Sequence, residues 1–241
     1  MALADHDTTA GLHEAREAAE GSGLTVIPAV ELSTLTTDGQ DAHVLGYFID
    51  PSQPELVDAL SGFREARLSR AYAIVESLSR AGLPLTIDDV LSHSRDGAVG
   101  RSHVARALVD AGHVGTVADA FAVHIGRGRP HYITKAVPTP KEAIALIHSA
   151  GGLAVLAHPA VSGFWDSAAD VTAAGFDGIE AYHADHTPEQ RTFFRLMADS
   201  LGLFVTGGSD FHGPEAPNPA VGSIEYPPEA LSAFLAAAQS R

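Results

Sequence analysis

Hydrophobic and polar residues follow one another along this chain in a pattern that predicts strands separated by helices. Short, nearly continuous apolar runs occur at 24–30, 43–49, 153–157 and 178–182, and a further run starts at Phe204. Between most of them lie stretches with helical spacing, such as 139–150, which starts at Thr139-Pro140 and stops before Gly151. Apolar strands that alternate with helices are typical of a mainly parallel sheet.

One pair of runs departs from this alternation. The runs 24–30 and 43–49 are separated by a segment that contains Asp38-Gly39, which is a turn signal. We therefore expect an antiparallel hairpin. In such a hairpin the end of one strand lies beside the start of the other, so Glu31 and His43 should come close together.

The middle of the chain has no strand rhythm. Apolar residues from Pro54 to Gly82 fall near helical spacing, and 86–91, 102–111 and 116–124 read as three shorter helices. This pattern predicts a core formed by 1–59 and 138–241, interrupted by a helical insertion at 60–137.

Composition narrows the possible functions. The chain has 241 residues, a net charge of −15 and no cysteine, so disulfides, thiolate metal sites and a cysteine nucleophile are excluded. The negative charge disfavours binding to duplex nucleic acid or to a membrane surface. No apolar run approaches the length of a membrane span, and we expect a cytoplasmic protein.

Polar residues stand at the edges of the predicted strands. Asp210 and His212 follow the Phe204 run two positions apart, and on extended backbone such residues point to the same side. The other candidates at strand edges are His6, Glu31, His43 and His158. A closed (β/α) barrel would gather them around one mouth, whereas an open doubly wound sheet would gather them at one switch point.

Histidine and carboxylate together are good ligands for Zn, Mn or Fe. A single histidine at a strand end is more often structural, but six such residues at one level of a barrel favour a metal centre. Glu31 is placed to bridge two cations, although capping of the following loop is the simpler alternative. The histidines in helical or loop sequence are expected on the solvated surface: His13, His93, His113, His124 and His148.

Five ordered segments resemble motifs of the polymerase and histidinol phosphatase (PHP) family, and the likeness covers nearly the whole chain. They are Ala4–Gly11, Ile27–Glu31, His43–Tyr47, Leu156–Pro159 and Gly208–His212. The resemblance implies a distorted, TIM-like (β/α)7 barrel that holds up to three divalent metal ions (Mn, Zn, Fe or Mg). The likeness is strongest to stand-alone phosphoesterases that act on nucleotides or nucleoside bisphosphates.

The resemblance also implies residue roles. Glu31 looks like a bridging carboxylate, with His43 and His158 completing one metal site. Asp210 would serve a second ion, and His6 with His212 a third. Arg101 and His103 resemble positions that face the substrate phosphate from the insertion, and His183 is expected to line the same pocket.

The family pattern begins earlier than this sequence does. It opens with a strand that carries an H-x-H pair and with an aspartate in the following turn, and neither precedes Ala4 here. We expect the first βα unit to be missing, through a misassigned start or through a real loss. In this reading only the site of Glu31, His43 and His158 is complete.

The leading hypothesis is hydrolysis of phosphate monoesters on a small phosphorylated substrate, such as a nucleotide, by metal-activated water. Glu31, Asp210 and His212 would carry the catalysis. One alternative is a truncated, catalytically impaired protein that binds metal or phosphate. Another is a barrel hydrolase of the deacetylase type. The sequence does not decide the oligomeric state.

Overall fold

The computed structural model describes residues 1–37, 39–94, 98–134, 136–162, 168–213 and 219–239. The chain divides into two compact units. Unit 1 comprises Met1–Val57 and Pro138–Arg241, and unit 2 comprises Asp58–Val137.

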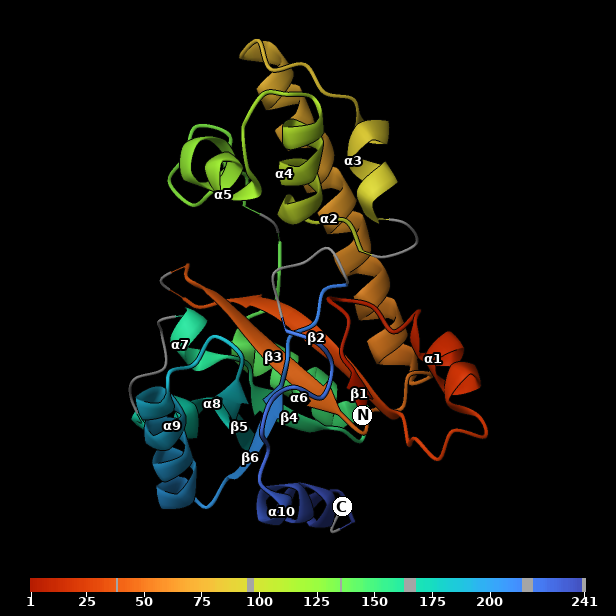
Figure 1. Ribbon diagram of the computed structural model, residues 1–241, viewed down its shortest axis with the longest axis vertical. Coiled ribbons are helices and arrows are strands. Elements are labelled where there is room, and N and C mark those ends of the chain that lie inside the picture. The colour runs from red at the N-terminus through yellow and green to blue at the C-terminus, as the bar shows by residue number, and fades with distance from the viewer. Residues whose placement is uncertain (38, 95–97, 135, 163–167, 214–218, 240–241) are drawn as a thin grey trace. The chain divides into compact units, whose positions relative to one another are not determined.

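A curled sheet of six strands forms the centre of unit 1 (Figure 1). The strands lie in chain order: β1 (Ala2–Leu3), β2 (Ile27–Leu35), β3 (Asp41–Tyr47), β4 (Leu153–Leu156), β5 (Gly178–His183) and β6 (Phe204–Gly208). β1/β2, β4/β5 and β5/β6 are parallel pairs, while β3 runs antiparallel to both of its neighbours. The fold is therefore mixed α/β, and closure into a seven-stranded barrel stays a prediction.

The predicted hairpin is present in β2 and β3, but Glu31 does not end its strand. β2 continues to Leu35, and Glu31 pairs with Leu45 in the middle of the ladder. The strand continues because its later residues suit the sheet: Leu32 is fully buried, and the Thr34 hydroxyl donates a hydrogen bond to the Ala42 carbonyl at 2.9 Å. Of the predicted turn, Asp38 lies outside the described residues.

Helices cover the sheet of unit 1. They are α1 (Leu12–Ala19), α6 (Pro140–Ser149), α7 (Pro159–Ser162), α8 (Ala168–Ala174), α9 (Pro188–Leu201) and α10 (Pro228–Gln239). α6 starts at Thr139 as predicted, in a capping box with Glu142. Gly11 is the N-cap of α1, and the Thr8 hydroxyl accepts a hydrogen bond from the Ala10 N–H at 3.3 Å.

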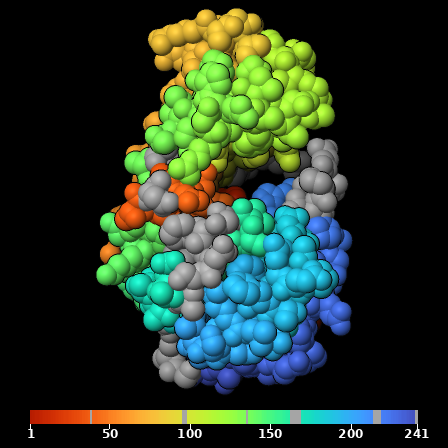
Figure 2. All heavy atoms as spheres, turned by 90° about the vertical axis from the view of Figure 1, so that its left-hand side faces the viewer, coloured from red at the N-terminus to blue at the C-terminus, as the bar shows by residue number. Residues whose placement is uncertain are grey.

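Close packing of helices on the sheet explains why a glycine stands in β3 and why an aromatic residue of α10 is buried. A Cβ on Gly46 of β3 would lie 2.9 Å from Ile147 of α6, so a side chain at this position would push the helix off the sheet. Phe234 of α10 packs with Leu45 and Tyr47 in one buried cluster. Burial of such an aromatic side chain contributes about 1.5–3 kcal/mol. α9 packs against β5 and forms part of the outer surface of unit 1 seen in Figure 2.

Unit 2 is helical throughout its described part. It contains most of α2 (Pro54–Arg80), then α3 (Ile87–Ser94), α4 (Arg101–Asp110), α5 (Val117–Ala120) and a short π-helix, η1 (Phe121–Ile125). The three short helices predicted from the sequence are therefore found. Ile74, Leu78, Val104 and Leu108 belong to the buried apolar cluster of this unit. Among the described helices of the whole chain, none is long and apolar enough to cross a bilayer.

Candidate metal centre

The Glu31 carboxylate is the meeting point of three imidazoles. Its Oε1 lies 2.7 Å from Nδ1 of His43 and 3.1 Å from Nε2 of His158, and its Oε2 lies 3.7 Å from Nδ1 of His6. His43 Nδ1 and His158 Nε2 are themselves 3.2 Å apart. The structure thus brings together four of the residues that the sequence selected, from three distant parts of the chain.

Backbone pairing sets these side chains in place. His6 forms an isolated parallel bridge with Glu31, and the Asp7 N–H donates to the Glu31 carbonyl at 2.9 Å. His43 pairs with Ser33, so it stands diagonally across the hairpin from Glu31 on the same face of the sheet. His158 follows the end of β4 with a positive φ of 25°.

A buried carboxylate without compensation would be costly. Glu31 is only 5% exposed. Although burial raises the pKa of Glu31, the charges of His6 and His43 and the hydrogen bonds from His158 and His43 bring it well below its ordinary value. Burial likewise lowers the pKa of His158, yet the hydrogen bond and charge of Glu31 raise it to about 9. The four residues therefore form one coupled acid–imidazole cluster.

The donor set fits a divalent cation. One ligand atom each from His6, Glu31 and His43 lie within 4.8 Å of one another, and Nδ1 of His158 is buried without a hydrogen-bond partner among the described residues. Imidazole nitrogens combined with a carboxylate suit Zn, Mn and Fe.

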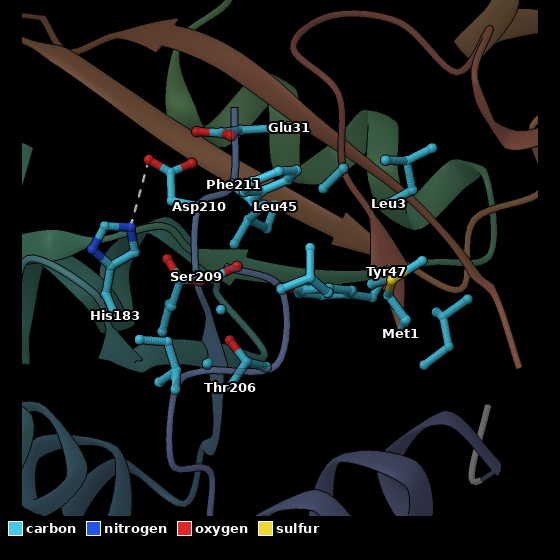
Figure 3. A pocket seen from close by; sticks show the side chains of 18 of the residues that line it. Met1, Leu3, Glu31, Leu45, Tyr47, His183, Thr206, Ser209, Asp210 and Phe211 are labelled. Carbon is cyan, nitrogen blue, oxygen red and sulfur yellow. Dashed lines mark ion pairs between the residues drawn. The ribbon is translucent and has the colours of Figure 1, made fainter. Parts of the chain in front are cut away.

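Asp210, His212 and His183 form a second group. The Asp210 carboxylate lies 3.8 Å from His183 Nε2, along the dashed line in Figure 3, and 3.5 Å from His212 Nδ1. The strand-alternation argument for Asp210 and His212 is wrong, because β6 ends at Gly208 and Asp210 has a φ of +50°. Irregular backbone after β6, with Asp210 at positive φ, and not an extended strand, brings the two side chains together. The rings of His6 and His212, with centroids 6.0 Å apart, link this group to the first.

A backbone contact selects the tautomer of the neutral His183 ring. This ring is 1% exposed, and its Nδ1 accepts a hydrogen bond from the Asp185 N–H at 3.1 Å. A neutral ring that accepts at Nδ1 carries its proton on Nε2. His183 therefore presents an N–H donor to the side of the site where Asp210 lies.

Both groups open into one cavity of about 770 Å³. Figure 3 shows Glu31, Asp210 and His183 on one side of it, and Met1, Leu3 and Tyr47 on the other. The cavity therefore combines a cluster of acids and imidazoles with an apolar wall.

Two buried polar residues of the site were missed from the sequence. Glu180 of β5 is 5% exposed, lines the cavity and accepts the His158 N–H at 2.9 Å. Burial raises the pKa of Glu180, against the lowering effect of His183 and His158. A carboxylate within the apolar run 178–182 was the available signal. His186, 3% exposed, lies in the turn after β5 and had no comparable signal.

Arg101 and His103 lie in unit 2, at the first turn of α4. The Arg101 guanidinium lies over the ring of Tyr132, 5.4 Å from its centroid, and also over Phe121. His103 Nδ1 accepts from the Gly100 N–H at 3.0 Å, which caps the helix. Their expected contact with a substrate phosphate stays a prediction.

A mixed α/β sheet that delivers carboxylates and imidazoles to one cavity defines a metal-dependent hydrolase. No family model matches the chain. It is 36% identical over 234 residues to a 3′,5′-nucleoside bisphosphate phosphatase of Chromobacterium violaceum, covering 93% of this chain and 81% of that protein. It is also 36% identical over 228 residues to the 5′-3′ exoribonuclease Rnm of Salmonella typhimurium, covering 89% and 75%.

A solved structure shows the same relationship. The crystal structure of a protein described as a metal-dependent phosphoesterase, from Bifidobacterium adolescentis, has a TM-score of 0.87 and 37% identity over 98% of this chain and 84% of that one. The chain therefore belongs to the PHP family of metal-dependent phosphoesterases, and it is a hydrolase. That the chain lacks the H-x-H segment of the family stays a prediction.

Proposed function

We propose that this phosphoesterase hydrolyses a phosphate monoester on a nucleotide or a nucleoside bisphosphate. The observation that carries the proposal is the buried Glu31 carboxylate in contact with His43 and His158. The activity of the relative from C. violaceum, a nucleoside bisphosphate phosphatase, favours a substrate of this class.

We assign the metal ligands as follows. Glu31 would bridge two ions, with His43 and His158 completing one site. Asp210 would serve the second ion, and His6 with His212 the third. Divalent cations in such a site lower the pKa of water and neutralise charge on phosphate oxygens. Glu31, Asp210 and His212 are thus the residues on which turnover depends.

Negative charge that grows on the phosphate oxygens as the ester breaks is stabilised by hydrogen-bond donors in the site. The Nε2–H of His183 supports this role: its Nδ1 accepts the Asp185 N–H, so the neutral ring is a hydrogen-bond donor at Nε2 and not a proton donor to the leaving oxygen. The ring is also held at 1% exposure, so its orientation is restricted.

The distribution of charge supports a phosphate-binding role for unit 2. Ten of the fifteen basic residues fall in residues 58–137, against eight of the thirty acidic ones. Arg67, Arg70 and Arg101 line one small cavity in this unit. A planar guanidinium binds phosphate through paired hydrogen bonds. Arg101 and His103 are accordingly assigned to substrate binding.

Metal analysis combined with a product screen tests the proposal. The purified full chain would be assayed for bound metal, then incubated with Mn²⁺ and nucleoside 3′,5′-bisphosphates, 5′-mononucleotides, a 5′-phosphorylated RNA oligomer and an N-acetylated amide. We expect release of inorganic phosphate from a nucleotide or bisphosphate. Acetate without phosphate would indicate the deacetylase type. Bound metal without any hydrolysis would support a protein that only binds metal and phosphate.

A further inference from the structure

The backbone around His158 is held by two buried side chains from β5 and the turn after it. Glu180 Oε2 accepts the His158 N–H at 2.9 Å. Two residues further on, the Ala160 N–H donates to Nε2 of His186 at 3.4 Å. The segment that carries one metal ligand is therefore fastened on both sides of Pro159.

His158 needs such support because its conformation is unfavourable. Its φ of +25° lies in the region that side chains other than glycine rarely adopt. Such a residue costs on the order of 1–3 kcal/mol and persists only where its surroundings over-determine it. Here the backbone must turn sharply so that the ring faces Glu31 and His43.

The Glu180 carboxylate lies between the His158 backbone and Gly208. Oε2 is occupied by the His158 N–H, and a Cβ added to Gly208 would lie only 3.2 Å from Oε1. The carboxylate is thus confined between the segment after β4 and the last residue of β6. Glu180 supports the backbone of the metal ligand His158 and is not itself assigned to a metal.

His186 is held equally firmly. Its Nδ1 donates to the Ala181 carbonyl at 3.0 Å, so Nε2 is left as an acceptor for Ala160. Its ring also contacts His183 and Phe194, with both pairs of centroids 5.3 Å apart. One side chain therefore connects β5, the start of α7 and the His183 ring.

We infer that Glu180 and His186 are positioning residues, which hold His158 in the orientation that the metal centre requires. The inference rests on the proposed metal-dependent function. Partners that orient a metal ligand typically change metal affinity or activity by about 10–100-fold when they are mutated.

Titration of the metal-free full chain with Co²⁺, followed by visible absorption, measures this role without any assay of turnover. Glu180→Ala removes the acceptor, whereas Glu180→Gln keeps one. Asp177→Ala is the matched control, because Asp177 Oδ2 also accepts a backbone N–H, that of Ala154 in β4, at 2.7 Å, four residues before His158. We expect Co²⁺ to bind Glu180→Ala about 10–100-fold more weakly, with altered absorption bands, and both Glu180→Gln and Asp177→Ala within about threefold of wild type.

The outcomes separate the two proposals. Equal Co²⁺ affinity and spectra for wild type and Glu180→Ala would overturn the positioning role and leave the metal centre standing. A wild-type chain that binds no Co²⁺ would overturn the metal centre itself, and the positioning role with it. Should Glu180→Ala fail to fold, His186→Phe decides: it keeps a ring but offers no acceptor to Ala160, and unchanged Co²⁺ affinity there contradicts the inference.

Discussion

Glu31 Oε1 lies 2.7 Å from His43 Nδ1, although Glu31 stands opposite Leu45 in the hairpin and His43 stands opposite Ser33. The contact is therefore diagonal. It exists because residues two apart on a strand share a face and long side chains reach the next pair. A shift of the register by one residue would turn one of the two partners to the other face of the sheet, so the hairpin register fixes the centre of the site.

Replacement of Glu31 by glutamine should abolish turnover and largely spare the fold. The amide keeps the size of the side chain but loses the charge that draws His6, His43 and His158 together. We expect kcat/KM for phosphate release in Mn²⁺ to fall at least about a thousandfold, which corresponds to roughly 4 kcal/mol. Glu17→Gln is the control, since Glu17 forms an exposed pair with His13. Near-normal activity of Glu31→Gln would refute the bridging role.

Added metal should stabilise the chain through the same carboxylate. A cation that binds only the folded state, present at 100 times its Kd, adds about 2.7 kcal/mol to the free energy of unfolding. For a protein of this size that corresponds to a rise in Tm of about 5–10 °C. Thermal denaturation after removal of metal with a chelator, with and without Mn²⁺, measures the shift. A Glu31→Gln variant that gains as much as the wild type would contradict the assigned ligands.

The sequence predicted most elements of the fold because their local signals agree with the tertiary structure. Thr139-Pro140 gave a helix start that the capping box with Glu142 confirms. The turn signal before His43 gave the hairpin that the β2–β3 ladder confirms. Boundaries were less certain: β2 passes through Glu31 to Leu35, because pairing with β3 accommodates polar residues that look like a strand end in isolation.

Conformations that depend on contacts between distant parts of the chain were not predicted from the sequence. The left-handed backbone of Asp210 has no local signature, and it replaced the expected extended geometry. His186 gained its position only from contacts with Ala160 and Ala181 across the fold. Glu180, by contrast, lies inside the apolar run 178–182, whereas Glu31 follows the run 24–30, so the strand-edge criterion that selects Glu31 does not select Glu180.

Arg101 should affect substrate binding more than the chemical step. If its guanidinium holds a substrate phosphate, Arg101→Ala should raise KM about 10–100-fold with a much smaller change in kcat, because an interaction shared by ground and transition states affects KM alone. Arg101→Lys should recover little, since a lysine lacks the planar fork. Arg80→Ala is the control, because Arg80 lies in the same unit and pairs with Glu76 on the surface. Steady-state kinetics that show no difference between the two alanine variants would remove Arg101 from the site.

Acidification should destabilise unit 2 through His131. This buried ring contacts Ser77 Oγ at 2.8 Å, and burial, with a smaller effect from His124, lowers the pKa of His131 below 6.5. The unfolded chain therefore binds more protons than the folded one just below pH 6.5. The neutral His131 ring makes its full contribution to the free energy of unfolding above that pH. This contribution is lost as the pH falls toward the pKa of His131 in the folded chain. Thermal melts between about pH 7.5 and 5 should fall less steeply for His131→Gln than for wild type. Parallel curves, or an equal effect from His13→Gln on the surface, would contradict this.

Asp177 should matter for stability and not for catalysis. Its Oδ2 accepts hydrogen bonds from the Ala154 N–H at 2.7 Å and from His148 Nε2 at 2.8 Å. His148 was expected on the open surface; it instead ties α6 to the start of β5. This carboxylate acts at the start of β4, whereas Glu180 holds the residue two positions after its end. We expect Asp177→Ala to lower the free energy of unfolding by about 1–3 kcal/mol, because the backbone N–H of Ala154 is left without its acceptor. That loss lowers Tm by about 2–12 °C. Thermal denaturation and phosphate-release kinetics on the same preparations check both halves, and a fall in kcat/KM beyond the loss of folded protein would show that the two ends of β4 are coupled.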